Sequence, residues 1–158
     1  TAETVVSFLT EKMQMDPSRS GMLGLLSGGS IGRAIELNTE ELIAFRSELG
    51  RLLSAAGGSD PMRLLALASF LGQDKKEVRQ GLKILGTYFR DALVYKETGK
   101  TGMIINADEL SVVSSLAERL RGEQILENLS IIEKSGEMME MNVNKSLTLE
   151  AMAFKLHM

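Results

Sequence analysis

The sequence predicts an all-α fold, a helical bundle preceded by a smaller group of short helices. Hydrophobic residues make up 44% and charged residues 25% of the 158 residues, the ordinary balance of a globular domain. Only two prolines, Pro17 and Pro61, interrupt the chain, so long helices are permitted. No segment shows sustained alternation of apolar and polar residues, and we therefore expect no sheet. The run from Met103 to Ile105 is the one ambiguous stretch.

Three short helices are expected in the first 37 residues. The helical spacing of Val5, Leu9 and Met13 indicates the first, from about Ala2 to Gln14. The second and third are indicated by N-cap residues, by a proline at the first helical position and by glycines suited to a left-handed C-cap. In chain order, these signals are Asp16-Pro17, Gly28-Gly29 and Ser30, and the third helix is expected over Ile31 to Leu37.

Six further helices are expected after residue 37. Asn38 and Glu41 have the spacing of a capping box and open the first of them. The last follows a polar break, where an asparagine of the break or Ser146 is expected to cap it. The expected segments are Asn38 to Gly57, Pro61 to Leu71, Asp74 to Thr98, Asn106 or Asp108 to Leu120, Glu123 to Met141, and Ser146 onward.

The longest of these helices, Asp74 to Thr98, carries an unusually wide apolar stripe. Its apolar residues recur mostly three or four positions apart between Val78 and Val94, so neighbouring elements can pack on two sides of it. The helices before Leu37 are short and rich in glycine, whereas those after Asn38 are long. We therefore predict two domains, residues 1–37 and residues 38–158.

Composition excludes several classes of function. The chain has no cysteine, which rules out a disulfide scaffold, a thiolate zinc site and a cysteine nucleophile. The net charge of -3 argues against a protein whose whole surface binds nucleic acid. No apolar run approaches the ~20 residues that a membrane span needs, and we expect a cytoplasmic protein without a membrane partner. The chain begins at Thr1 rather than Met, so we expect it to be part of a longer protein.

No set of residues has the pattern of a catalytic or metal site. His157 is the only histidine, and a lone histidine near the end of a chain is typically a solvated surface residue. No histidine and carboxylate set has metal-ligand spacing. Ser111, Ser114 and Ser115 have no base nearby in the sequence. We expect no catalytic residue, no metal and no cofactor in this chain.

The glycine-rich segment from Gly28 to Ala34 is the most unusual local feature. It lacks the lysine and hydroxyl residue of a P-loop, and no strand precedes it as in a dinucleotide-binding turn. One interpretation is a tight turn between helices in which Gly32 permits close packing. The other makes Arg33 a phosphate sensor, supported by Gly29, Ser30 and Gly32.

Two charged segments in the long helix allow two interpretations each. Arg90 and Asp91 are either separate surface charges or include one partly buried group that ties helices together, since adjacent residues on a helix do not face each other. The basic cluster consists of Lys75, Lys76, Arg79 and Lys83. It is either a solvated face or a contact for DNA phosphates or for an acidic patch of a partner.

The corner before the last helix is the second unusual segment. Asn142 and Asn144 flank Val143, and Leu147 and Glu150 follow on the helix. One interpretation is a simple turn between helices, because asparagine side chains bond readily to nearby backbone. The other is a fixed docking surface for a neighbouring subunit.

Three of these segments, in this order, resemble the C-terminal part of bacterial DNA polymerase III clamp-loader subunits. The turn Ser27 to Leu37 looks like the end of an AAA+ lid, in which Arg33 stands at the sensor-2 position. Phe89 to Lys96 resembles the Arg-Asp helix of the delta-prime collar domain. Asn142 to Glu150 is similar to the Asn-Val-Asn-Pro-x-Leu-x-Leu-Glu ending of that family, although Lys145 replaces the proline.

The resemblance implies a lid remnant over residues 1–37 and an oligomerisation collar over 38–158. Arg90, Asp91, Asn142, Asn144, Leu147 and Glu150 would be structural or subunit-interface residues. The implied function is a non-catalytic scaffold that binds gamma/tau and delta subunits and acts on the sliding clamp and primed DNA through the whole complex, a DNA polymerase. ATP and Mg²⁺ would belong to that complex only. Two alternatives stay open: the same region of an ATP-hydrolysing gamma/tau subunit, or a free-standing helical regulatory or DNA-binding module.

Overall fold

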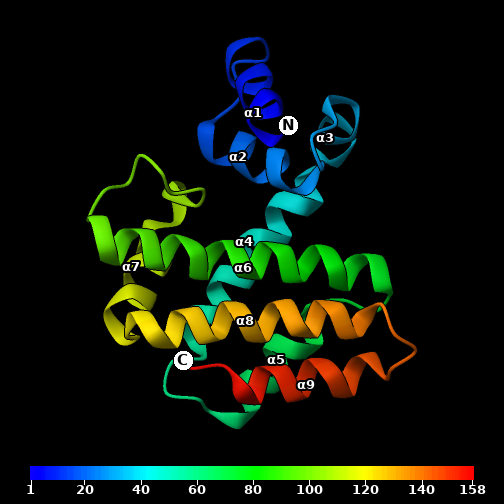
Figure 1. Ribbon diagram of the computed structural model, residues 1–158, viewed down its shortest axis with the longest axis vertical. Helices are drawn as coiled ribbons and strands as arrows, with labels where there is room; N and C mark the ends of the chain where they lie inside the picture. The colour runs from blue at the N-terminus through cyan, green and yellow to red at the C-terminus, as the bar shows by residue number, and fades with distance from the viewer.

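The computed structural model describes residues 1–158 and is all-helical, as predicted (Figure 1). No strand is present, and Met103 to Ile105 lies in turns rather than in a strand. The α-helices are α1 Ala2–Glu11, α2 Pro17–Leu26, α3 Ile31–Leu37, α4 Glu40–Ala55, α5 Pro61–Phe70, α6 Lys75–Thr98, α7 Leu110–Arg119, α8 Gly122–Met139 and α9 Lys145–Lys155, with a 3₁₀ helix η1 at Ala107–Glu109.

Helices α1, α2 and α3 form a small lobe at one end of the molecule, where the N-terminus lies (Figure 1). Helix α2 packs against α1 and α3 and also reaches α6. Val5, Leu9 and Leu23 are buried in this lobe. Helix α4 leaves the lobe and carries the chain into the larger group of helices.

The larger group, α4 to α9, is arranged in layers (Figure 1). Helix α6 lies beside α8, α8 lies beside α9, and α9 also packs against α5. Helix α7 packs against α6 and α4, so α6 is covered on more than one side, as its wide apolar stripe predicts. Tyr88 and Phe89 of α6 are fully buried. The buried apolar residues of both groups form one cluster, and the division into domains at residue 37 stays a prediction.

Most helix ends follow from local sequence signals. The side chains of Asp16 and Asp60 cap α2 and α5, and each is followed by proline. Ser30 caps α3 as predicted. Helix α1 ends earlier than predicted, and Gln14 has a left-handed φ of 52°. Helix α8 also ends earlier than predicted, at Met139.

The predicted cap of α4 needs correction, whereas one of the two caps predicted for α9 is found. Thr39, not Asn38, caps α4, because its hydroxyl accepts a hydrogen bond from the Leu42 N–H at 3.2 Å. The side-chain oxygen of Asn38 instead accepts a bond from Arg19 Nε at 2.5 Å. In α9 the cap is Asn144 rather than Ser146.

The glycine that allows close helix packing is Gly24, not Gly32. A Cβ atom placed on Gly24 would lie 2.5 Å from Val6 Cγ2 and 3.0 Å from the Ala2 carbonyl oxygen. A Cβ atom on Gly32 would meet only Ser30 Oγ, at 4.0 Å. The interpretation that Gly32 permits close packing is therefore wrong, and the close approach is between α1 and α2.

Candidate functional site

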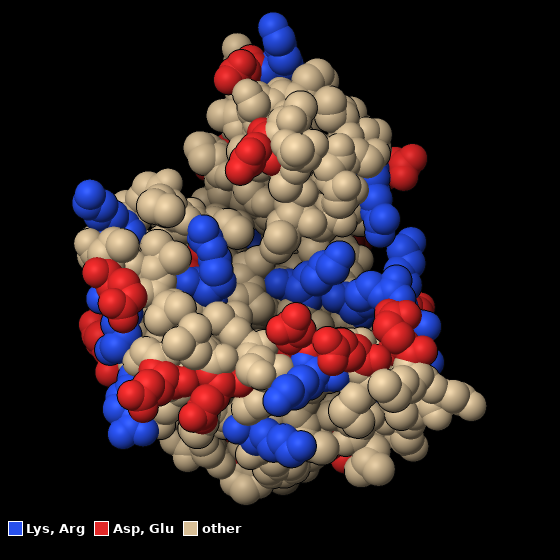
Figure 2. Space-filling view, in the orientation of Figure 1, with Lys and Arg blue, Asp and Glu red and all other residues tan.

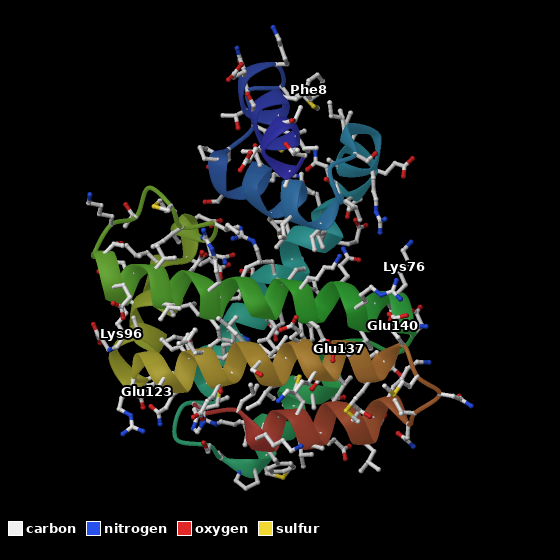
Figure 3. The ribbon with its side chains drawn as sticks, in the orientation of Figure 1. Phe8, Lys76, Lys96, Glu123, Glu137 and Glu140 are labelled. Atoms are coloured by element: carbon white, nitrogen blue, oxygen red, sulfur yellow. The ribbon has the colours of Figure 1, made fainter.

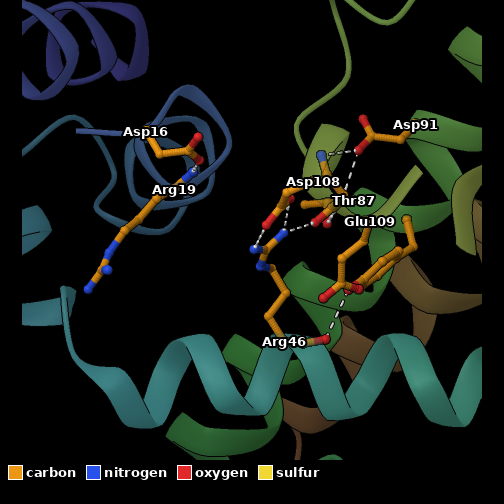
Figure 4. Close-up of polar contacts among 9 residues, drawn as sticks. Asp16, Arg19, Arg46, Thr87, Asp91, Asp108 and Glu109 are labelled. Carbon is orange, nitrogen blue, oxygen red and sulfur yellow. Dashed lines mark hydrogen bonds and ion pairs between the residues drawn. The ribbon is translucent and has the colours of Figure 1, made fainter. Parts of the chain in front are cut away.

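A buried polar centre joins α4 to α6 and to the segment after α6 (Figure 4). Arg46 projects from α4 and is only 4% exposed. Its Nη1 donates hydrogen bonds to Asn106 Oδ1 at 3.1 Å and to Asp108 Oδ1 at 2.8 Å, and its Nη2 binds the second oxygen of Asp108. A guanidinium that binds both oxygens of a carboxylate forms a strong and directional ion pair. Arg46 therefore fixes η1, which contains Asp108, against α4.

Asp91 is the second member of this centre and is fully buried in α6. Its carboxylate accepts hydrogen bonds from the backbone N–H of Ile105 at 3.1 Å and of Asn106 at 2.7 Å. The side-chain amide of Asn106 donates to Asp91 at 2.8 Å and to Thr87 Oγ1 at 3.0 Å. A buried carboxylate is stable only where such donors replace water. Asp91 thus holds the segment after α6 against the helix.

Arg90 and Asp91 do contact each other, which the spacing rule for helices did not predict. Arg90 Nη1 lies 2.8 Å from Asp91 Oδ1, and it also donates to the Met103 carbonyl oxygen at 2.6 Å. The interpretation as two separate surface charges is wrong, whereas the alternative with one buried group agrees with the structure. Of the two, only Arg90 reaches the surface, because Asp91 is fully buried.

The electrostatics of the polar centre move the pKa values of Asp108, Arg46 and Tyr88 away from neutral pH. The bond from Arg46 lowers the pKa of Asp108, and the same bond raises the pKa of Arg46. Burial raises the pKa of Tyr88, and so does its hydrogen bond to Glu109 at 2.5 Å. A general acid or base needs a pKa near the working pH. The arrangement is therefore suited to holding elements together rather than to transferring protons.

A small cleft between α3 and α6 is lined by cationic side chains. They are Arg33 from α3 and Lys76, Arg79 and Lys83 from α6, with Leu26, Leu37 and Gln80 between them. Figure 2 shows Lys and Arg side chains gathered where the N-terminal lobe meets the layer below it. The structure thus brings together two features that lie apart in the sequence, the sensor-like arginine and the basic cluster. We refer to this feature as the basic cleft.

The turn that leads to Arg33 has the backbone geometry expected of its glycines. Gly28 and Gly29 have φ angles of 61° and 87°, which are left-handed. The Ser30 hydroxyl accepts a hydrogen bond from the Arg33 N–H at 3.2 Å and begins α3. Gly32 and Arg33 are exposed on the first turn of that helix, and the Arg33 side chain lines the basic cleft.

One carboxylate lies beside the outer edge of the cleft. Glu140, just after α8, binds Lys75 at 3.0 Å and also binds Arg79. The bonds from Lys75 and then Arg79 lower the pKa of Glu140. Figure 3 labels Glu140 near Lys76 at one end of α6. Lys75 therefore faces α8 rather than the cleft, so the predicted basic cluster is divided between two surfaces.

The corner between α8 and α9 is exposed, and an asparagine caps the helix that follows it. Asn144 Oδ1 accepts a hydrogen bond from the Leu147 N–H at 3.0 Å, which confirms the interpretation of an asparagine as the N-cap. Asn142 is exposed, and Leu147 is 64% exposed. Glu150 lies half-buried on α9, beside a shallow hollow toward α5. The corner therefore exposes the apolar side chain of Leu147 in the first turn of α9, whose start is capped by Asn144.

Asn128 is a buried residue whose role sequence analysis missed. Its amide donates to the His157 carbonyl oxygen and its carbonyl accepts from the His157 N–H, both at 2.8 Å. His157 Nε2 also lies 2.5 Å from a carboxylate oxygen of Glu127. The His157 ring is a surface group, as expected, and it is 35% exposed beside Glu127, while the backbone of His157 is bound to α8. Asn128 had no recognisable signal, since its partner lies 29 residues away in the sequence.

Two kinds of feature are absent from the structure. No group of three or more histidine and acidic residues is placed to hold a metal ion. None of the helices combines the length and the apolarity required to cross a membrane.

The layered helices and the buried polar centre define an all-helical bundle domain. Residues 40–157 match the family described as DNA polymerase III, delta subunit, C terminal, and the matched range begins with the first residue of α4. The chain belongs to this family. It is a C-terminal domain of a DNA polymerase III clamp-loader subunit, and the family implies association with other subunits of that loader. No curated protein matches the chain.

Proposed function

We propose that this chain is the lid-and-collar part of a delta-prime subunit and that it serves as a non-catalytic scaffold of the clamp loader. Its family membership supports the loader. The delta-prime assignment rests on the Arg90-Asp91 pair and on the corner from Asn142 to Asn144, both of which resemble that subunit. In this role the chain holds gamma/tau and delta subunits in a cytoplasmic ring that places the sliding clamp on primed DNA. It needs no cofactor of its own, and ATP and Mg²⁺ act elsewhere in the complex.

The observation that carries this proposal is the set of exposed large apolar side chains on α8, α9 and the corner between them. A soluble chain that exposes several large apolar side chains in one region typically uses them to bind another protein. Methionine, which is prominent here, adapts its shape to a partner at low cost. The exposed apolar residues of this region are Leu126, Met138, Met141, Leu147 and Phe154.

The polar centre supports a scaffold role in a second way. A subunit that positions its neighbours needs helices whose relative orientation is fixed. Arg46, Asp91 and Asn106 join α4, α6 and η1 by charge-assisted hydrogen bonds, which are shorter and stronger than neutral ones. The geometry of the bundle is thus specified by directional contacts as well as by apolar packing.

The alternative is the same region of a gamma/tau subunit, which hydrolyses ATP. The complete gene product distinguishes the two. An intact Gly-x-x-x-x-Gly-Lys-Ser/Thr motif upstream, with ATP hydrolysis by the purified full-length protein, would favour gamma/tau. A degraded motif without hydrolysis would favour delta-prime. Family membership already argues against the third interpretation, a free-standing module unrelated to the loader.

Assembly provides the test of the scaffold role. The chain is mixed with purified gamma/tau and delta subunits without nucleotide and passed over a sizing column. Co-elution as a stable complex is the expected result, because the uncovered surface needs no nucleotide to bind. Elution of the chain alone, under conditions in which full-length subunits assemble, would contradict the proposal.

A further inference from the structure

We propose that the basic cleft binds the phosphate backbone of single-stranded nucleic acid. Its cations come from both walls, Arg33 from α3 and Lys76, Arg79 and Lys83 from α6. The inference is independent of the delta-prime assignment, because it depends only on side chains of this chain and on their charges.

Three of the four cations have no anionic partner within the chain. The ion pairs of the structure include Arg79, which binds Glu140, but none includes Arg33, Lys76 or Lys83. Like charges that face one hollow repel each other, and this repulsion is relieved when an anion enters. Phosphate suits the site because arginine and lysine both bind its oxygens strongly.

Lys76 lies in the first turn of α6, where the carboxylates of Asp74 and Glu77 cap the helix start. Neither carboxylate forms an ion pair with Lys76. Lys75, in the same turn, is paired with Glu140. An anion in the cleft would therefore interact with the unpaired ammonium group of Lys76.

The surroundings favour a single strand over a duplex. Arg79 and Lys83 also line a second hollow, toward α8, whose other wall carries Glu133, Glu137 and Glu140. In Figure 2 acidic side chains border the basic ones on this side. A duplex presents the phosphates of two strands, and one strand would lie against these carboxylates. A single strand is narrow enough to follow the cleft alone.

The length of the cleft sets how many phosphates it can hold. Lys76 and Lys83 are seven positions apart on one helix, which corresponds to about 10.5 Å along its axis. That length accommodates roughly two or three phosphates of one strand. We therefore expect weak to moderate binding, with a shallow dependence on salt.

The test is fluorescence anisotropy of the whole 158-residue chain with a labelled oligo-dT strand. The logarithm of the association constant should fall with the logarithm of salt concentration with a slope of about -2, since each of three contacts contributes about -0.7. Between 50 and 200 mM salt this corresponds to about 16-fold weaker binding. A duplex of the same length should bind more weakly than the single strand.

Charge reversal locates the site. The double variant Lys76→Glu/Lys83→Glu should weaken binding at least about tenfold, and Arg33→Glu on the opposite wall should weaken it as well. The matched control is Lys134→Glu/Lys155→Glu, which changes net charge equally at exposed positions outside the cleft. All four α6 and control positions are exposed, so the variants should keep the helical circular dichroism of the wild type.

Three results would overturn the inference. The first is that the wild type binds no oligo-dT at 50 mM salt. The second is that the control variant weakens binding as much as the cleft variants do. The third is that an acidic peptide binds in the cleft and single-stranded DNA does not, which would assign the cleft to a protein partner.

Discussion

Asn106 and Asp91 are joined by two hydrogen bonds, because the backbone N–H and the side-chain amide of Asn106 both donate to the same carboxylate oxygen of Asp91, at 2.7 and 2.8 Å. Neither side chain is exposed to solvent. Asn106 also accepts a bond from Arg46, so the asparagine connects a buried anion to a buried cation. This relationship fixes the path of the chain between α6 and α7.

Removal of the Asp91 carboxylate should strongly destabilise the fold. The variant Asp91→Ala leaves the N–H groups of Ile105 and Asn106 and the Arg90 guanidinium without their acceptor, and we expect a loss of about 3 kcal/mol in the free energy of unfolding. Urea denaturation followed by circular dichroism measures this. The control Glu118→Ala, at an exposed position, should change stability by less than about 0.5 kcal/mol. Equal effects of the two substitutions would contradict the role of Asp91.

Acid should weaken the contact between Arg46 and Asp108. The pKa of Asp108 is lower in the folded protein than its ordinary value of 3.8, so its contribution to stability is present above that value. The contribution is lost as pH falls through the lowered pKa. The pKa of Arg46 is raised, which affects only strongly alkaline solutions.

The variant Asp108→Asn isolates this contribution. The difference in unfolding free energy between the wild type and Asp108→Asn should be constant above about pH 5 and should shrink below about pH 4. Urea unfolding at a series of acid pH values measures it. A difference that persists unchanged to pH 2.5 would show that the Asp108 charge contributes nothing to stability.

Two glycines of the N-terminal lobe should respond to alanine with opposite signs. Gly24→Ala places a methyl group against Val6 and the Ala2 carbonyl, and should destabilise the protein by about 1–3 kcal/mol. Gly32→Ala places it in open space within a helix, and should stabilise by about 0.5–1 kcal/mol. Thermal unfolding of the two variants, each compared with the wild type, decides this. The same sign for both would argue against the close contact of α1 with α2.

The end of the chain should detach when Asn128 is replaced. Asn128→Ala removes both hydrogen bonds to the backbone of His157 and leaves those groups near the surface, at a cost of about 2 kcal/mol. Carboxypeptidase should then remove the last residues faster than from the wild type. Glu127→Ala, which removes only the contact to the histidine ring, should retain most of the protection. Unchanged digestion of Asn128→Ala would contradict this anchoring.

The helices could be predicted from the sequence because their signals are local. Asp16-Pro17 and Asp60-Pro61 specify helix starts within a few residues, and the structure follows both. The cap of α4 could not be predicted in the same way. Asn38 is as good an N-cap as Thr39 in isolation, but Arg19, distant in sequence, binds the Asn38 side chain.

The buried polar residues could not be predicted because their partners are distant in the sequence. Arg46 is 62 residues from Asp108. A single sequence gives no information on which charged residue of a helix faces inward, and Arg46 has no neighbouring signal. The basic cleft has the same origin, since Arg33 and Lys83 come to line one hollow only when the N-terminal lobe is placed beside α6.

The central claim is that the surface formed by α8, α9 and their corner binds neighbouring loader subunits. Its most direct test is co-elution of Leu147→Asp with purified gamma/tau and delta subunits. Leu147 is 64% exposed, so an aspartate there should not disturb the fold, whereas it should be unfavourable in an apolar interface. The matched control is Met103→Asp, at a residue 63% exposed outside this surface. We predict that Leu147→Asp elutes alone while Met103→Asp stays in the complex; a complex retained by Leu147→Asp and lost by Met103→Asp would contradict the claim.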